Sequence, residues 1–312
     1  MRSSTPGLIM VEKNVVAPSS QKLIALLWFL RHQPGVALSI IYLVLVALAA
    51  IFGSYFFSES ASIVNFASRN LPPLSLEPSW NFILGSDSLG RPTLDRLLAA
   101  AQPTVGITLT AVAIGATVGI GLGLVAGMRS GPLSAVIMRF TDALMSFPTL
   151  LLAILLLYVV KSSIGTVIVV LAVSRVALFI RVTRAETMEI RSRVYVTASQ
   201  AIGAPISWIT RVHLLPTLMP TLVTLLAVEI AFTMLAESSL SFIGVGVQSP
   251  GVSWGLMVAQ GRDYLATQWW LAFWPGLAIV LTAMSLIVLA DWMKTALDPR
   301  QKWRLQSAES NK

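Results

Sequence analysis

The chain has 312 residues, of which 55% are hydrophobic and 12% are charged, and its formal net charge is +8. A soluble domain carries about 25% charged residues, so this composition excludes an ordinary soluble fold. Several apolar runs exceed the roughly 20 residues that cross a bilayer as a helix, which indicates an all-α polytopic membrane protein. The chain has no cysteine, which excludes disulfides and thiolate chemistry. Basic residues beside anionic lipid headgroups account for the positive charge without nucleic acid.

The first third of the chain is predicted to hold one span and one long loop. Residues 1–34 form a polar segment, in which 23–30 are amphipathic and are expected to lie on the membrane surface. An uncharged first transmembrane helix follows at 35–57, and residues 58–102 form a loop rich in Ser, Pro and Asn. In this loop, turns around Asp87 and Arg91 could bind calcium or a substrate, but a structural clasp below the second span is favoured.

The second span is predicted at 104–127, and its glycines recur every four residues along one helix face: Gly115, Gly119, Gly123 and Gly127. A ladder of small residues lets another helix backbone approach closely. The partner could be a helix of this chain or of a second subunit, and packing within this chain is favoured.

Four further spans are predicted after a short basic turn at 129–139. They are 143–160, 162–180, 217–244 and 265–290, the last beginning with an interfacial belt of Trp269, Trp270 and Trp274. Ionisable residues inside spans are functional candidates. Glu229 and Glu237 lie about two turns apart in the fifth span, and Arg175 lies in the fourth. For either glutamate, lining a translocation path and pairing with Arg175 remain equally open.

The polar segment 181–216 is the richest cluster of charge in the chain. It cannot lie in the hydrocarbon, because burying so many charges would cost several kcal/mol each. Residues 191–202 favour a short helix, Gly203 and Pro205 end it, and a second helical start leads through Trp208. The segment is therefore predicted to be a helix–turn–helix docking surface on the water face of the membrane.

The distribution of lysine and arginine predicts the orientation. With the amino terminus inside, sixteen of these residues fall on the cytoplasmic side and five on the opposite side. Basic residues favour the cytoplasmic face, so we expect both termini and the segment 181–216 to be cytoplasmic.

Two patterns bear on catalysis. Residues 251–255 fit the G-x-S-x-G pattern of serine hydrolases, but that pattern needs a strand context and a nearby histidine. Both histidines are predicted on the side opposite Ser253, so a structural turn is favoured and no catalytic residue is expected. The chain also has no G-x-x-x-x-G-K-[ST] phosphate loop, so it cannot be its own ATPase.

The docking segment resembles the EAA loop of permease subunits of bacterial ATP-binding cassette (ABC) importers. Thr197 and Ser199 replace the family's Glu and second Ala, whereas Gly203 and the Leu-Pro ending stand. The resemblance implies that the contact with the ATPase subunits is made by this loop, through Thr197, Ala198, Ser199, Gly203, Pro205, Leu215 and Pro216.

Five other motifs resemble those of peptide- and nickel-type importer permeases and appear in the same order. They are the Gly-Arg loop at 84–91, Ser-Phe-Pro at 146–148, Glu-x-x-Leu-Ser-Phe at 237–242, Ser-Trp-Gly at 253–255 and Leu-Asp-Pro-Arg at 297–300. The chain is similar to the second (C-type) permease of a peptide importer.

This resemblance implies a type I ABC importer permease fold with six transmembrane helices in the bacterial plasma (inner) membrane. It implies a permease core with five transmembrane helices over 103–292 and a cytoplasmic tail at 293–312. The implied partners are a second homologous permease, two cytoplasmic ATP-binding subunits and an extracytoplasmic substrate-binding protein. No cofactor is expected in this chain, since ATP and Mg would bind the ATPase subunits.

The cargo implied by the resemblance is di- or oligopeptide, with Glu229 and Glu237 along the path. A nickel or other small-solute importer permease is the alternative of the same architecture. An ion-coupled secondary transporter, with these glutamates as ion sites, is the alternative of another class. That alternative predicts discontinuous helices in inverted repeats, and no such repeat is found in the sequence.

Overall fold

The computed structural model describes residues 33–75, 79–129, 131–160 and 163–297, and these are nearly all helical. The predicted amphipathic segment at 23–30 and most of the predicted tail lie outside the described residues. The helices are α2 (Pro34–Phe57), α3 (Thr93–Met128), α4 (Pro132–Ser146), α5 (Thr149–Val159), α6 (Ile164–Arg191), α7 (Val194–Ala201), α8 (Ile206–Ile209), α9 (Leu215–Ile243), α10 (Trp254–Arg262) and α11 (Trp270–Leu297).

Five of the described helices are long and apolar enough to cross a membrane, or six spans result if the bent pair α4–α5 counts as one. The five are α2, α3, α6, the continuous stretch Ile206–Ile243 that includes α8 and α9, and α11. This finding confirms the predicted polytopic all-α class.

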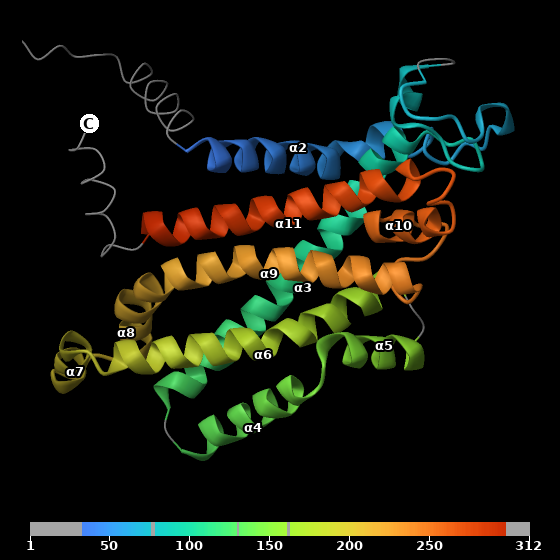
Figure 1. Ribbon diagram of the computed structural model, residues 1–312. Coiled ribbons are helices and arrows are strands. Elements are labelled where there is room, and N and C mark those ends of the chain that lie inside the picture. Colours follow the sequence, from blue (N-terminus) through green and yellow to red (C-terminus); the bar gives the residue numbers. More distant parts are fainter. Residues whose placement is uncertain (1–32, 76–78, 130, 161–162, 298–312) are drawn as a thin grey trace, which may run out of the picture.

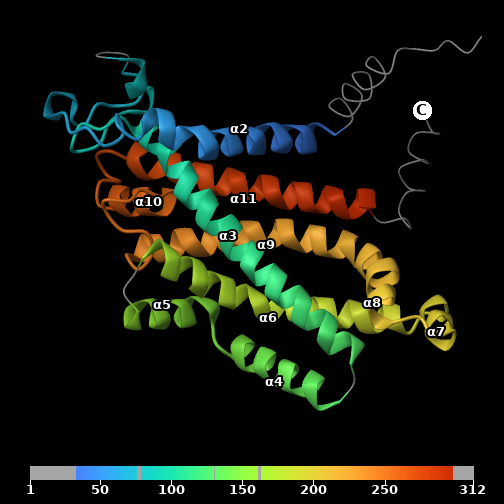
Figure 2. The same cartoon turned by 180° about the vertical axis from the view of Figure 1, so that it is seen from behind.

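The long helices run side by side, and α3 crosses them obliquely (Figures 1 and 2). At one end, α7 and α8 project beyond the body; we call this the α7 end. At the other end, which we call the α10 end, α10 lies beside the loop that joins α2 to α3. The docking segment and the Gly-Arg loop therefore lie at opposite ends of the bundle.

The predicted third span at 143–160 is wrong as a single helix. The segment consists of two helices that meet at 88° around Phe147 and Pro148. Phe147 is extended, with φ −93° and ψ 134°, because a proline disfavours the helical conformation of the residue before it. Helix α4 also begins at Pro132, within the stretch predicted as a basic turn.

Helix α3 begins at Thr93, about three turns before the predicted start of the second span. Pro103, just before the predicted start at 104, lies inside the helix. A proline is tolerated in a membrane helix where side chains satisfy the backbone locally. Here the Thr104 hydroxyl donates to the Ala100 carbonyl (2.9 Å) and accepts from the Trp254 N–H (3.0 Å).

Two other predicted ends differ from the structure. Helix α6 continues to Arg191 rather than 180, because a helix can leave the hydrocarbon and carry its charges into water without a break. Helix α11 begins at Trp270 rather than 265, since the preceding residues form hydrogen-bonded turns such as Tyr264 N–H to Gly261 C=O (3.1 Å).

The glycine ladder of α3 faces α6, with which α3 makes its most extensive contact. A methyl group added at Gly119 would lie 2.5 Å from the Cβ of Phe179, and one at Gly123 would lie 2.6 Å from the Cβ of Thr183. Additions at Gly115 and Gly127 would meet α6 at 2.9 and 2.6 Å. These glycines pack within this chain, and they fix α6, whose last turns carry α7.

Candidate functional site

Helices α7 and α8 are held on the end of the bundle by one apolar cluster. Val196 of α7 and Ile209 of α8 are buried against Ile190 of α6, together with Leu214 and Leu218. Burial of such side chains stabilises an association by roughly 1.5–3 kcal/mol each. The α7–α8 element is therefore fastened to the ends of α6 and α9 rather than hanging as a loose loop.

A polar contact also joins α7 to the start of α9. The Ser199 hydroxyl lies 3.1 Å from Nε2 of His213, and the rings of Tyr195 and Trp208 lie edge-on to the imidazole at 5.3 and 5.1 Å. Sequence reasoning named Ser199 for the docking loop but missed His213. The two residues are fourteen positions apart, and only the folded hairpin brings them together.

Gly203 forms the turn between the two helices. Its φ is +86°, its N–H donates to the Gln200 carbonyl (3.0 Å), and the Ala204 N–H donates to the Ser199 carbonyl (3.0 Å). This left-handed end of a helix favours glycine. Pro205 then precedes α8 in an extended conformation. No atom of the described residues lies within 4 Å of an added Cβ at Gly203, so within this part of the chain the turn faces open space.

The tip of this element presents apolar side chains to the outside. Ile202 is 86% exposed and Val194 is 83% exposed, and Ile206 and Trp208 are also exposed. Exposed apolar side chains gathered on one element indicate a contact with another protein or with the membrane. We call the exposed residues of α7, the turn and α8 the coupling surface.

Thr197 and Ala198 of α7 are also exposed and so belong to this surface. The Thr197 hydroxyl donates back to the Val194 carbonyl (2.9 Å). A π-helical turn, Thr210–Leu214, leads into Leu215 and Pro216, the first turn of α9.

Glu229 of α9 forms an ion pair with Arg175 of α6, with Oε2 and Nη1 2.9 Å apart. Glu229 is 3% exposed, so in this conformation it joins two spans inside the bundle. The pairing with Arg175, one of the two possibilities for the glutamates, is therefore found for Glu229.

Glu237 is fully buried and has other partners. Its Oε1 accepts from the Ser241 hydroxyl (2.7 Å), and that hydroxyl accepts from the Val247 N–H (3.0 Å). The pairing of Glu237 with Arg175 is thus not found. Instead, Glu237 helps to hold the chain where it leaves α9.

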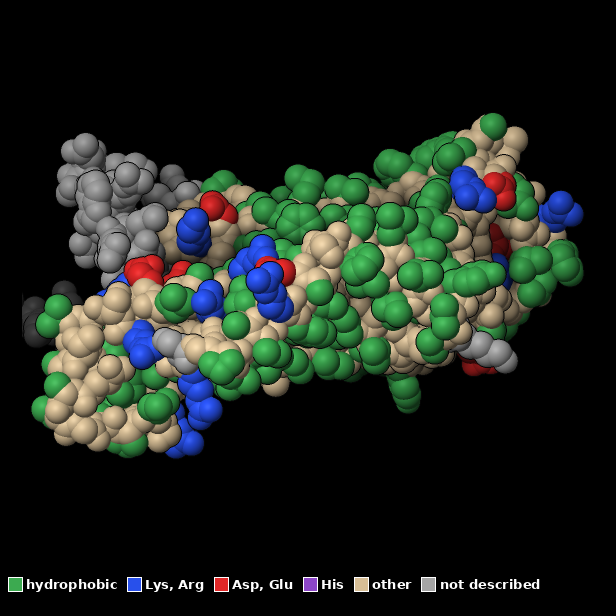
Figure 3. All heavy atoms as spheres, turned by 90° about the horizontal axis from the view of Figure 1, so that it is seen from below, with side chains coloured by type: hydrophobic (Ala, Val, Ile, Leu, Met, Phe, Trp, Pro, Cys, Tyr) green, Lys and Arg blue, Asp and Glu red, His purple; other side chains and the backbone are tan. Residues whose placement is uncertain are grey.

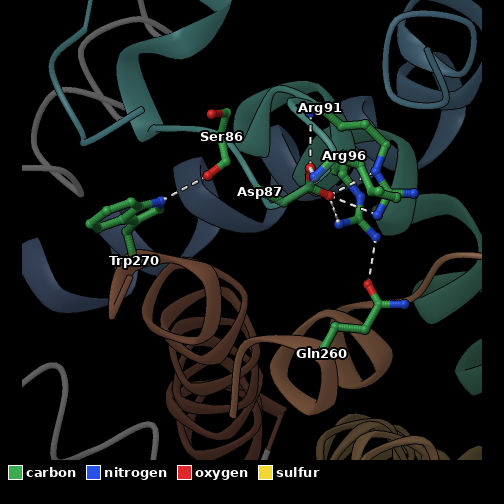
Figure 4. Close-up of polar contacts among 7 residues, drawn as sticks. Ser86, Asp87, Arg91, Arg96, Gln260 and Trp270 are labelled. Carbon is green, nitrogen blue, oxygen red and sulfur yellow. Dashed lines mark hydrogen bonds and ion pairs between the residues drawn. The ribbon is translucent and has the colours of Figure 1, made fainter. Parts of the chain in front are cut away.

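The α10 end is tied together by a clasp centred on Asp87 (Figure 4). Its carboxylate accepts from the Arg91 side chain (Nε, 2.7 Å), the Arg96 side chain (Nη1, 2.8 Å) and the N–H groups of Leu89 and Arg91. Arg96 also donates to Gln260 of α10 (2.7 Å). With its oxygens held by protein donors, Asp87 acts as the predicted structural clasp.

Two other predictions at this end have a clear outcome. The prediction that Trp270 belongs to an interfacial belt is wrong. Its side chain is buried, and its indole N–H donates to the Ser86 carbonyl (3.2 Å; Figure 4). Ser253 is buried at the start of α10, where its hydroxyl accepts from the Leu256 N–H (3.2 Å). Ser253 is a helix cap, as the favoured structural interpretation predicted.

Residues 119–303 match the model of the family described as "Binding-protein-dependent transport system inner membrane component". Among curated proteins, the chain is 32% identical to the probable D,D-dipeptide transport system permease protein DdpC of Escherichia coli, over 88% of this chain and 91% of that one. It is 34% identical to the di/tripeptide transport system permease protein DppC of Pseudomonas aeruginosa (87% and 90% covered). It is 32% identical to the nickel transport system permease protein NikC of Escherichia coli (87% and 96%).

Two solved structures share the fold. One is an inward-facing conformation of the MetNI methionine ABC transporter, with a TM-score of 0.57 and 19% identity over 66% of this chain and 98% of that one. The other is an amino acid ABC transporter crystallised with histidines, with a TM-score of 0.51 and 14% identity over 64% and 92%. At these identities the similarity concerns the fold alone.

Proposed function

Since this chain belongs to the family of binding-protein-dependent transport system inner membrane components and is a permease subunit of an ABC importer, we propose that its cargo is a di- or oligopeptide. The observation that carries this proposal is the 32–34% identity to two dipeptide-type permeases over nearly 90% of the chain. The 32% identity to a nickel permease supports nickel as the second candidate cargo.

The coupling surface is proposed to receive the ATPase subunits. Its exposed apolar tip and open Gly203 turn suit a partner groove, and the chain itself has no phosphate loop. The partners proposed are two ATP-binding subunits, a second permease and a substrate-binding protein at the α10 end. In this arrangement the α7 end and both termini face the cytoplasm.

The coupling surface is continuous with two spans, which suggests how a movement there would be transmitted. Helix α6 runs unbroken from Ile164 to Arg191, and Ile206–Ile243 also passes as one span. The apolar cluster around Val196 ties α7 to both. A displacement of α7 by the ATPase dimer would therefore move α6 and α9 together. If the ATPase dimer binds one position of α6 and α9 more tightly than another, this difference in affinity shifts the equilibrium toward the position that it binds more tightly.

A cavity of about 780 Å³ beside α9 supports a path for cargo. It begins at Pro216 near the coupling surface, follows Thr217, Thr221 and Thr224 of α9, and ends at Val228, the residue before Glu229. Glu186 and Glu189 of α6 also line it. We propose the inner part of the translocation path here. Glu229 and Glu237 lie farther along the same helix, where both are buried in this conformation and do not line the cavity.

Uptake by cells that express the complete transporter tests the cargo. Labelled dipeptide should accumulate, and Gly203→Asp should abolish that accumulation; labelled nickel should not accumulate above the level of cells without the transporter. Nickel uptake that depends on Gly203, with no peptide uptake, would replace the first candidate by the second. Uptake that survives ATP depletion but stops when the proton gradient is collapsed would contradict an ATP-driven importer.

A further inference from the structure

A cationic pocket lies at the α7 end, on the side of α6 away from the cavity proposed for cargo. Its volume is about 610 Å³, and it is bordered by the end of α3, the start of α4, the last turns of α6 and one side of α7. Three arginines line it: Arg129, Arg184 and Arg191. Among the described residues that line this pocket, none is acidic.

The acidic residues nearby are engaged elsewhere. Asp142 of α4 pairs with Arg181 (2.6 Å), and Glu189 pairs with Arg193 (3.0 Å). The ion pairs found among the described residues include none of the three pocket arginines. Within the described part of the chain, the partner found for Arg184 is neutral: its Nε donates to the Ser134 hydroxyl at 3.4 Å. The pocket therefore holds three positive charges without a counter-charge from this part of the chain.

The spacing along α6 explains this separation of charge. Arg184, Met188 and Arg191 follow at intervals of four and three residues, so they share one helix face. Glu186 and Glu189 lie on the opposite face, where they line the cavity beside α9. Helix dipoles favour a cation at a carboxyl end, which accounts for Arg129 after α3 and Arg191 at the end of α6. They do not account for Arg184, two turns inside α6, converging with the other two.

The surroundings indicate what anion would complete the site. The pocket lies at the ends of helices long and apolar enough to span the membrane. Helix α4 beside it presents apolar side chains outward, with Leu133, Val136 and Phe140 exposed by 44%, 65% and 53%, although Arg139 is exposed as well. In Figure 3, which views the molecule from the α4 side, Lys and Arg gather toward the α7 end and hydrophobic side chains cover the middle. Basic pockets between membrane helices at the membrane surface bind phosphate headgroups.

We propose that the pocket formed by Arg129, Arg184 and Arg191 binds the phosphate of an anionic phospholipid, with its acyl chains along the exposed apolar side of α4. Thr197 and Gln200 of α7 also border the pocket. A lipid bound there would contact α7 as well as α4, and so would brace the coupling surface against the membrane.

Native mass spectrometry of the full chain tests this proposal, with phosphatidylglycerol and phosphatidylcholine offered in equal amounts. The pocket variant replaces Arg129, Arg184 and Arg191 by glutamine. The matched control makes the same change at Arg181, Arg193 and Arg211, three arginines of the same end that do not line the pocket. A third variant carries lysine at the three pocket positions.

The wild-type chain should retain phosphatidylglycerol in preference to phosphatidylcholine. The affinity should fall by about fivefold for each pocket arginine removed, and it should be unchanged in the control and largely kept by the lysine variant. If the triple variant does not fold, Arg129→Gln can be used alone. Arg129 is exposed, so this single change should leave the fold intact, and it should lower the affinity about fivefold.

Several results would overturn the proposal. Equal retention by the pocket variant and the wild-type chain, or equal losses in the pocket variant and the control, would show that the pocket is not a lipid site. Full displacement of the lipid by excess inorganic phosphate would assign the arginines to a free anion. A pocket variant that keeps its lipid but no longer captures the ATPase subunits would assign them to an acidic partner surface.

Discussion

Arg175 of α6 and Glu229 of α9 meet inside the bundle, with Nη1 and Oε2 2.9 Å apart and with side chains 14% and 4% exposed. The pair joins the two spans that continue into the coupling surface. A charge left alone in this position is costly, whereas an apolar pair of similar size need not be. The ion pair can therefore be tested by removing one partner or both.

We expect Arg175→Met and Glu229→Met each to destabilise the protein by about 3–5 kcal/mol. The double variant should be less destabilised than either single variant, because it leaves no unpaired charge. Apparent unfolding temperatures in detergent measure this, with Arg262→Met as the control, since the exposed Arg262–Asp263 pair should contribute about 0–1 kcal/mol. Losses that simply add in the double variant would contradict the role given to the pair.

Glu237 is expected to tolerate glutamine better than leucine. Its Oε1 accepts from the buried Ser241 hydroxyl (2.7 Å), and glutamine keeps an acceptor there, whereas leucine leaves a buried donor unsatisfied at a cost of about 1–3 kcal/mol. Transport rates of Glu237→Gln and Glu237→Leu decide the matter. Equal and complete loss in both variants would show that the charge itself matters and would favour the ion-coupled alternative.

The α3–α6 contact is expected to reject any side chain at the glycine ladder. Gly119→Ala should destabilise the protein by about 1–3 kcal/mol through overpacking, because the added methyl would lie 2.5 Å from the Cβ of Phe179. Gly121→Ala, two residues along the same helix, is the control, since none of the described atoms lies within 4 Å of a Cβ there. Equal unfolding temperatures for the two variants would contradict the close packing.

The orientation can be measured with single cysteines in this cysteine-free chain. Ser60 lies three residues after the end of α2, and Ser192 lies between α6 and α7. The loop that follows α2 is at the α10 end, and α7 is at the opposite end (Figure 1). An impermeant thiol reagent added outside intact cells should label the cysteine at 60 and not the one at 192. The reverse pattern would place the coupling surface outside the cell.

Much of the fold could be predicted because membrane spans follow from long apolar runs. Helices α2 and α9 begin and end within two residues of the predicted spans. The ladder of glycines also predicted close packing within this chain, because a period of four keeps them on one helix face. These features depend on local sequence alone.

The predictions failed where proline chemistry depends on surroundings. Pro103 and Pro148 both lie near apolar runs, yet α3 continues through the first and the chain turns by 88° at the second. At Pro103 the Thr104 side chain and α10 supply hydrogen bonds nearby. Because one of these bonds comes from α10, far along the chain, the sequence around Pro103 does not predict it.

The turn of the candidate site could be predicted from the sequence, but the contacts between residues far apart in the chain could not. The Gly203-x-Pro205 spacing predicted where the helix ends, and Gly203 ends it in the left-handed conformation, with φ +86°. Partners distant in sequence could not be assigned: His213 for Ser199, Gln260 for Arg96, and Glu229 rather than Glu237 for Arg175. These pairings depend on how the helices pack, which one sequence does not determine.

The proposal that α7, the Gly203 turn and α8 couple transport to the ATPase subunits is tested most directly at Gly203. Among the described residues, no atom lies within 4 Å of a Cβ added at Gly203, so the expected cost within the subunit is that of the left-handed backbone, about 1–2 kcal/mol. Gly244 is a matched control, because its φ is +88°, it also faces open space and it lies at the other end of α9.

The decisive measurement is capture of the ATPase subunits from membranes by tagged Gly203→Asp and Gly244→Asp proteins, with uptake assayed on the same membranes. Both variants should insert normally. Gly203→Asp should either lose the ATPase subunits or keep them and lose uptake. Gly203→Ala should show a smaller loss of the same kind. Gly244→Asp should keep the ATPase subunits. A Gly203→Asp protein that inserts, retains its ATPases and transports at the unmodified rate would contradict the coupling role of this surface.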